Sequence, residues 1–212
     1  MNKWIICSLA ILVIIALAIM RPFQAREIAN IDSKGKNIIC FGDSLTAGYN
    51  AAPRESYPSV LSRLLARPVT NAGLDGDTTQ TALARLERDV LAKDPLLVIV
   101  ILGANDFLDR RPIEETMEDL RTIISTIHQK GAMVAIGQLG PSTMHTYKDD
   151  YQRIAKQENA LLIESILEGI YGNPQLMSDH VHPNAEGYAK IAQKVHRAVE
   201  ALLEKNQKLR RQ

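Results

Sequence analysis

The sequence LLVIVIL occupies residues 96–102, and every residue in it is aliphatic. A run of this kind is typical of a central strand in a parallel sheet, because helices cover such a strand on both faces. The polar sequence GAND follows directly, at residues 103–106. The stretch therefore predicts an α/β fold in which a buried strand ends in a polar turn.

Shorter apolar runs alternate with segments of helical period along the rest of the chain. Alternation of this kind predicts a three-layer α/β/α domain around a flavodoxin-like parallel sheet of about five strands. Ligands of such a sheet bind beyond the carboxyl ends of its strands, so the residues after each run are the candidates for function. The other expected strands are residues 38–41, 69–71, 133–136 and 161–163, and the last helix is expected over residues 184–203.

The composition fits one globular domain. Of 212 residues, 46% are hydrophobic and 23% are charged, which excludes a disordered, collagen-like or coiled-coil chain. The formal net charge is +1, without the basic excess that nucleic-acid binding requires. Cys7 and Cys40 are the only cysteines, and neither disulfide framework nor zinc-ligand spacing is present. We therefore expect no nucleic-acid partner and no structural metal.

The amino-terminal segment differs from the rest. Residues 4–20 carry no charge and are nearly all aliphatic. At ~1.5 Å per residue they extend ~25 Å, slightly less than a hydrocarbon core of ~30 Å. Residues 1–20 are thus expected to be a signal peptide or an N-terminal membrane anchor, residues 21–36 a polar linker, and residues 37–212 the domain. Lys3 and Arg21 flank the apolar run, so charge alone gives no membrane orientation.

The sequence GDSL, residues 42–45, follows the first predicted strand. A serine hydroxyl such as that of Ser44 is a poor nucleophile unless a base removes its proton, and a tight turn must present it above the sheet. The tripeptide Gly42-Asp43-Ser44 can also be an ordinary turn that caps a helix. Ser44 is therefore a candidate nucleophile only if a base lies close to it.

Two further polar turns follow the second and third strands. These are NAGLDGDT at residues 71–78 and GAND at residues 103–106. Their glycines allow backbone N–H groups to approach a ligand, and Asn105 can direct an amide to the same point, so together they could hold an oxyanion. The alternative is ordinary turn chemistry, with Asp77 or Thr78 capping the next helix and Asp106 as a turn residue.

The sequence DHVHP, residues 179–183, precedes the last predicted helix. A carboxylate three residues before an imidazole, as in Asp179 and His182, can accept the Nδ1 hydrogen while Nε2 takes a proton from serine. His180 is the competing base, but it is only one residue from Asp179, so we expect it on the surface. A metal site of these three side chains is not expected, because no further ligand cluster accompanies them.

These four blocks together resemble the SGNH, or GDSL, hydrolase superfamily. The sequence FGDSLTAGY at residues 41–49 resembles the first block, and residues 71–78 resemble the second, with Gly76 at the family glycine. Residues 103–106 and 179–183 resemble the third and fourth. The likeness is greatest to the exported bacterial arylesterases, acyl-CoA thioesterases and lysophospholipases. Ala104 departs from that subgroup, which often has a second glycine there.

The resemblance implies a serine esterase or thioesterase acting on small acyl esters without a metal or organic cofactor. It implies Ser44 as nucleophile, His182 as general acid and base, and Asp179 as the carboxylate that orients it. The backbone N–H groups of Ser44 and Gly76 and the side chain of Asn105 would form the oxyanion hole. It also implies export to the periplasm or cell envelope, with residues 4–20 as the membrane contact if they are retained.

Two alternatives stay open. One is a carbohydrate acetylesterase of the same superfamily. The other is a non-enzymatic flavodoxin-like binding domain, which the absence of GxGxxG and GxxxxGK[ST] motifs disfavours.

Overall fold

A computed structural model describes residues 27–139 and 145–212. Within them, five parallel strands form one sheet in the order β2-β1-β3-β4-β5. This is the flavodoxin-like order, so the predicted sheet is confirmed, and each strand begins within one residue of its predicted run. The strands are β1 (Asn37–Gly42), β2 (Val69–Gly73), β3 (Pro95–Ile101), β4 (Met133–Gly137) and β5 (Leu161–Ile163).

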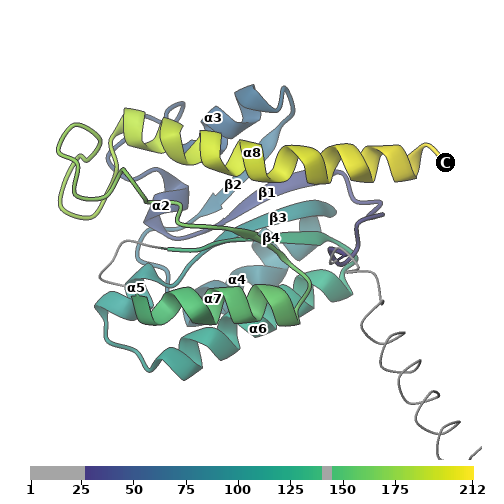
Figure 1. The fold of residues 1–212 in the computed structure, drawn as a ribbon, viewed down its shortest axis with the longest axis horizontal. Helices are drawn as coiled ribbons and strands as arrows, with labels where there is room; N and C mark the ends of the chain where they lie inside the picture. Colours follow the sequence, from purple (N-terminus) through teal and green to yellow (C-terminus); the bar gives the residue numbers. More distant parts are fainter. Residues whose placement is uncertain (1–26, 140–144) are drawn as a thin grey trace, which may run out of the picture.

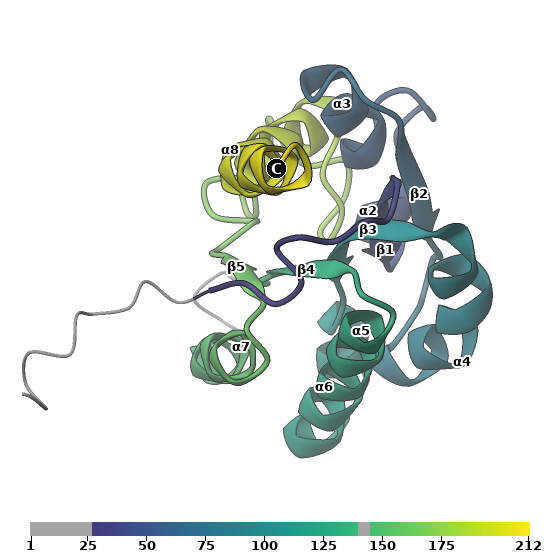
Figure 2. The same cartoon turned by 90° about the vertical axis from the view of Figure 1, so that its right-hand side faces the viewer.

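Helices cover both faces of the sheet, which gives the three predicted layers (Figures 1 and 2). The helices on one face are α3 (Tyr57–Leu64) and α8 (Ala185–Arg210). Those on the other are α4 (Thr79–Asp89), α6 (Ile113–Gln129) and α7 (His145–Gln157). The short elements between them are α2 (Ser44–Ala47), the 3-10 turn η1 (Leu91–Lys93) and α5 (Ala104–Leu108).

Strand β3 divides the core into two apolar clusters. All its residues are buried, as the aliphatic run predicted. Because side chains alternate along a strand, Leu97 and Ile99 pack in the cluster beneath α3 and α8, whereas Val98 and Val100 pack in the cluster above α4 and α6. The central strand thus holds the two helical layers in a fixed relation.

The last helix continues beyond its predicted end. It was expected to end at residue 203, but α8 extends to Arg210. The reason is Asn206, whose buried side chain donates hydrogen bonds to the backbone oxygens of Ile31 and Ser33, at 2.8 and 3.1 Å. Residues 204–210, which are mostly polar, therefore belong to α8, and Asn206 binds this part of the helix to the backbone that precedes β1.

The predicted signal or anchor, residues 1–20, lies outside the described residues, as do residues 21–26. The remaining part of the predicted linker contacts the domain. Asn30 donates side-chain hydrogen bonds to the backbone oxygens of His128 and Ala132, at 2.8 and 3.0 Å, and Ile31 is buried. In the part of the chain that the structure describes, no helix is both long and apolar enough to cross a membrane.

Candidate active site

Ser44 and His182, 138 residues apart in sequence, meet at the carboxyl end of the sheet. Ser44 is the first residue of α2, which is separated from the end of β1 by one residue, and His182 lies in the turn before α8. The Nε2 atom of His182 is 3.0 Å from the Ser44 Oγ, and its Nδ1 atom is 2.9 Å from the Asp179 Oδ2. Hydroxyl, imidazole and carboxylate thus form a continuous hydrogen-bonded chain.

Glycines allow α2 to sit directly on the ends of β1 and β2. Gly42 and Gly73 are paired in register on the two strands. A Cβ atom on Gly42 would lie 2.2 Å from the Ile101 backbone oxygen, and one on Gly73 would lie 2.1 Å from the Ala47 backbone nitrogen. No side chain fits at either position, so the turn that presents Ser44 packs backbone against backbone.

Asp43 fixes the start of α2. Its Oδ1 accepts the backbone N–H of Leu45 at 2.9 Å, as an N-cap does. Its Oδ2 is buried and accepts no hydrogen bond within the described residues. Burial raises the pKa of Asp43 to about 7, and the nearby charges of Asp77 and Asp106 act in the same direction. A buried carboxyl that resists ionisation therefore lies next to Ser44.

The turn that carries His182 is closed by Asp179. The Asp179 Oδ1 accepts the backbone N–H groups of Val181 and His182, at 2.7 and 2.6 Å. Slight burial disfavours the charge of Asp179, but the hydrogen bonds from the His182 backbone, the His182 ring and Val181 outweigh it and lower the pKa to about 2. His180 is exposed, as expected, and forms no hydrogen bond with Ser44 or Asp179.

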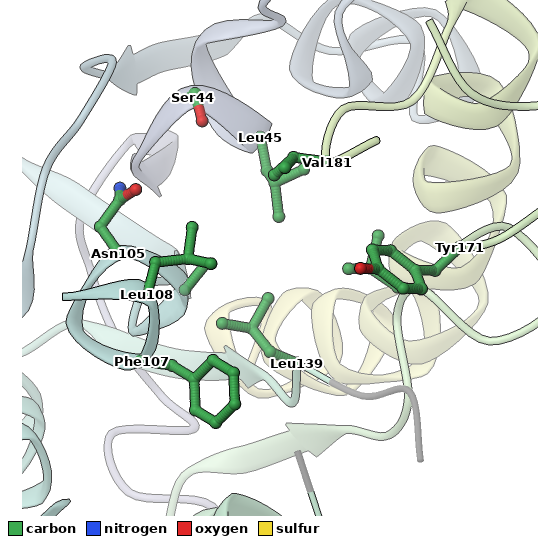
Figure 3. Close-up of a pocket in the computed structure, with 10 residues that line it drawn as sticks. Ser44, Leu45, Asn105, Phe107, Leu108, Leu139, Tyr171 and Val181 are labelled. Carbon is green, nitrogen blue, oxygen red and sulfur yellow. The ribbon is translucent and has the colours of Figure 1, made fainter. Parts of the chain in front are cut away.

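Asn105 lies at the same edge of the sheet, in α5 after β3. Its amide end points towards Ser44 across the mouth of a cavity (Figure 3). The Nδ2 atom donates to the Asp77 backbone oxygen at 2.8 Å, and an amide nitrogen carries a second hydrogen besides that one. Gly76 precedes Asp77 in an exposed turn, with a positive φ of 78° that favours glycine. Asn105 is thus close to Ser44, and its bond to Asp77 links it to the turn that contains Gly76.

Sequence reasoning missed a buried arginine beneath these loops. Arg85 of α4 donates from Nε to the Asp77 Oδ2 at 2.6 Å, and from its Nη atoms to the backbone oxygens of Gly42 and Ala72, each at 3.0 Å. Its guanidinium also lies 4.5 Å above the Phe41 ring. Arg85 therefore connects the ends of β1 and β2 to the loop on which Asn105 depends. An arginine among the polar positions of a helical pattern carries no signal of this role.

Asp106 is more than the turn residue that one interpretation of the sequence expected. It is fully buried, and its carboxylate accepts the backbone N–H and hydroxyl of Thr79, at 2.9 and 2.6 Å. Arg111 pairs with it at 3.0 Å. The expected helix cap is present, because Thr78 caps α4 and accepts the backbone N–H of Thr81. Asp106 thus joins the third block to the helix that follows the second.

An apolar cavity of about 90 Å³ opens beside Ser44 (Figure 3). Its walls come from α5, from the residue Leu139 after β4, and from the segment between β5 and α8. Leu108, Tyr171 and Val181 are more than one-third exposed and form its rim. The cavity is lined by Ser44, Leu45, Ala104, Asn105, Phe107, Leu108, Leu139, Leu167, Tyr171 and Val181.

Across residues 27–139 and 145–212, no group of three His, Cys, Asp or Glu side chains is placed to hold a metal ion. The chemistry that the described site offers is that of its hydroxyl, imidazole and carboxylate. A serine hydroxyl bonded to an imidazole that a carboxylate orients, next to an amide donor, defines the class of serine hydrolases.

Comparison with known proteins gives the family. Residues 40–190 match the GDSL-like Lipase/Acylhydrolase family, and the chain belongs to it. The chain is 33% identical over 170 residues to an arylesterase of Vibrio mimicus, and the match covers 74% of this chain and 85% of that protein. It is 30% identical over 164 residues to thioesterase 1/protease 1/lysophospholipase L1 of Escherichia coli K12, and that match covers 73% of this chain and 79% of that protein.

A solved structure shares the fold. The crystal structure of TesA superposes with a TM-score of 0.74 and 26% identity over 79% of this chain and 99% of that one. A more distant relative, an acetylxylan esterase of Geobacillus stearothermophilus, is 26% identical over 152 residues, 58% of this chain and 68% of that protein.

Proposed function

We propose that this protein is a serine esterase that hydrolyses acyl esters and thioesters through an acyl-serine intermediate. The observation that carries the proposal is the chain from Asp179 through His182 to Ser44, with contacts of 2.9 and 3.0 Å. The family of the chain and its esterase and thioesterase relatives support the same reaction.

In the proposed cycle, the Ser44 Oγ attacks the acyl carbonyl while the His182 Nε2 takes the hydroxyl proton. Asp179 keeps the ring in the tautomer with its hydrogen on Nδ1 and stabilises the imidazolium. The imidazolium then gives its proton to the leaving alcohol or thiol as the acyl-serine forms. A water molecule, deprotonated by His182, hydrolyses the acyl-serine and restores the enzyme.

The negative oxygen of each tetrahedral intermediate needs hydrogen-bond donors. We assign this role to the backbone N–H groups of Ser44 and Gly76 and to the Asn105 amide. Three features support the assignment. The Asn105 amide points towards Ser44, its second hydrogen is not used by the bond to Asp77, and the turn that contains Gly76 is bonded to the end of β1 through the Leu74 N–H and the Gly42 oxygen.

The cavity beside Ser44 favours an acyl group of hydrocarbon character. Leu108, Leu139 and Phe107 line it, and none of the lining residues that the structure describes is charged. A small acetyl group also fits, and the acetylxylan esterase relative favours acetylated carbohydrate as the second candidate substrate. Hydrolysis of p-nitrophenyl esters of increasing chain length, of acyl-CoA and of acetylated xylan distinguishes the two. A clear preference for the xylan would contradict esters and thioesters with a hydrocarbon acyl chain as the substrates.

Replacement of the nucleophile tests the reaction itself. Ser44→Ala is expected to abolish hydrolysis and labelling by a fluorophosphonate, because both require the hydroxyl. Mass spectrometry of the labelled wild-type protein should place the adduct on Ser44. Absence of labelling together with a copurifying nucleotide would instead support the flavodoxin-like binding domain.

We also propose that the enzyme acts in the periplasm or cell envelope. The support is the uncharged apolar sequence of residues 4–20. Cell fractionation with mass spectrometry of the amino terminus tests this. Loss of the first residues indicates a signal peptide, and an intact chain in the membrane fraction indicates an anchor. An intact chain confined to the cytoplasm would contradict export.

A further inference from the structure

The segment that continues from the helix of Ser44 reaches the Asp179 and His182 turn. The Tyr49 ring lies 4.5 Å from the His182 ring, centroid to centroid, at an interplanar angle of 40°. The next residue, Asn50, donates from Nδ2 to the Asp179 Oδ2 at 2.9 Å. The stretch of chain that presents the hydroxyl thus also contacts both other members of the hydrogen-bonded chain.

Asn50 gives the Asp179 carboxylate a hydrogen bond from outside its own turn. Three N–H groups from residues 181 and 182 bind the Asp179 carboxylate, and all belong to its own turn. The Asn50 amide comes from 129 residues away and binds Oδ2, the oxygen that also accepts the His182 ring. It therefore fixes the turn relative to the segment of Ser44, which bonds inside the turn cannot do.

The backbone around Asn50 is held in place. Gly48 ends α2 with a φ of 91°, and a Cβ atom there would lie 2.4 Å from the Ser56 Cβ. The buried Tyr188 of α8 donates its hydroxyl to the Tyr49 backbone oxygen at 3.0 Å. Asn50 itself has a φ of 61°, a left-handed conformation that asparagine tolerates better than most residues. An anchored segment therefore presents the Asn50 amide.

We propose that Asn50 is a positioning residue of the hydrolysis. Its amide holds the Asp179 carboxylate at the angle that keeps the His182 Nε2 on the Ser44 hydroxyl. The inference rests on the proposed esterase function and adds to it a fourth side chain. Because Asn50 acts through Asp179 and does not line the acyl cavity, its loss lowers kcat and leaves KM unchanged.

Because Asn50 contacts a carboxylate that binds His182, a change of charge at residue 50 should alter the pH dependence of hydrolysis. The ionisable groups at this corner are Asp179 and His182, the exposed His180 in the same turn, Tyr49, whose ring packs on His182, and Tyr188 from α8. Asp43 and Asp75 are close enough for their charges to act on Tyr188. Burial raises the pKa of Tyr188, and the negative charges of Asp43, Asp179 and Asp75 add to this effect. A carboxylate at residue 50 would lie beside Asp179 and would add a second negative charge close to the His182 ring.

The experiment compares two variants of the full chain. Asn50→Gly removes the amide and accepts the left-handed backbone, so it separates the hydrogen bond from backbone strain. We expect about a tenfold lower kcat for a p-nitrophenyl ester and an unchanged KM. The urea midpoint should change little, because the contact between Asn50 and Asp179 is exposed to solvent. Asn50→Asp also accepts the backbone but adds a negative charge, which favours the imidazolium form of His182. We expect the acidic limb of its kcat/KM profile to move to higher pH.

Asn30→Gly is the matched control. Asn30 has a similar φ, 56°, and also donates side-chain hydrogen bonds, but to the backbone oxygens of His128 and Ala132 at the other end of the sheet. This variant should lower stability and leave kcat and the pH profile as in the wild type.

Three results would overturn the role. They are an Asn50→Gly variant with wild-type kcat, a rise in KM without a fall in kcat, and an Asn50→Asp profile that does not move. If Asn50→Gly does not fold, the Asn50→Asp profile and its fluorophosphonate labelling rate decide. A wild-type protein that neither hydrolyses esters nor labels at Ser44 refutes the proposed function instead, so the two failures are distinguishable.

Discussion

Arg85→Met removes the buried cation beneath the active-site loops and keeps a side chain of similar length. Arg85 and Asp77 are 8% and 4% exposed, so the change leaves a buried carboxylate without its partner. It also removes the N–H groups that bind the Gly42 and Ala72 backbone oxygens. Removal of one member of a buried ion pair typically costs about 3–5 kcal/mol. With a urea m-value of about 2 kcal/mol/M, we expect the midpoint to fall by roughly 1.5–2.5 M.

Urea unfolding followed by circular dichroism measures this change. The matched control is Arg88→Met on the same helix, because Arg88 pairs with Asp89 on the surface and its side chain is 76% exposed. We expect no measurable shift for the control. The double variant Asp77→Asn with Arg85→Met should recover part of the loss, since it no longer buries an unpaired charge. An Arg85→Met midpoint equal to that of Arg88→Met would refute the reasoning.

Three further results are expected. Asn105→Ala should lower kcat by about 10²- to 10³-fold while the protein stays folded, and near wild-type turnover would contradict its oxyanion role. Burial raises the pKa of Asp43 from 3.8 to about 7, so the folded protein binds a proton that the unfolded chain releases between these values. Asp43 therefore lowers stability as pH rises from about 4 to 7, and urea midpoints of Asp43→Asn should fall less over that range than those of the wild type. Gly73→Ala should unfold at much lower urea than Gly76→Ala, because its Cβ would meet backbone at 2.1 Å whereas that of Gly76 meets nothing within 4 Å; equal midpoints would contradict the close packing of α2.

The strands follow from local sequence, and the resemblance of four blocks to a known family predicted that Ser44 meets His182. Aliphatic runs predict buried strands, and parallel strands bring their carboxyl ends to one edge, so the polar residues after them converge. Asp179 was also within reach of local reasoning, because three residues separate it from His182 and a tight turn brings the two side chains together.

Arg85, Asp106 and Asn50 were not within such reach. Arg85 occupies a polar position of an amphipathic helix, where most arginines are solvated. Its buried partners are Asp77 and the backbone ends of β1 and β2, which lie outside that helix. Asp106 is bound by Thr79 of α4 and by Arg111, which lies between α5 and α6. Asn50 bonds a residue 129 positions away. In each case the partner is set by packing between elements, which no periodicity in one segment reports.

Helix α8 extends from the active-site end of the domain to the end at which the described chain begins. It starts just after the turn of His182, and near its other end Asn206 binds the backbone ahead of β1. At ~1.5 Å per residue, its 26 residues extend ~39 Å. The described chain therefore enters the domain far from the opening next to Ser44 (Figure 1). A protein tethered to a surface through the residues before position 27 would point its acyl cavity away from that surface, towards molecules that arrive by diffusion.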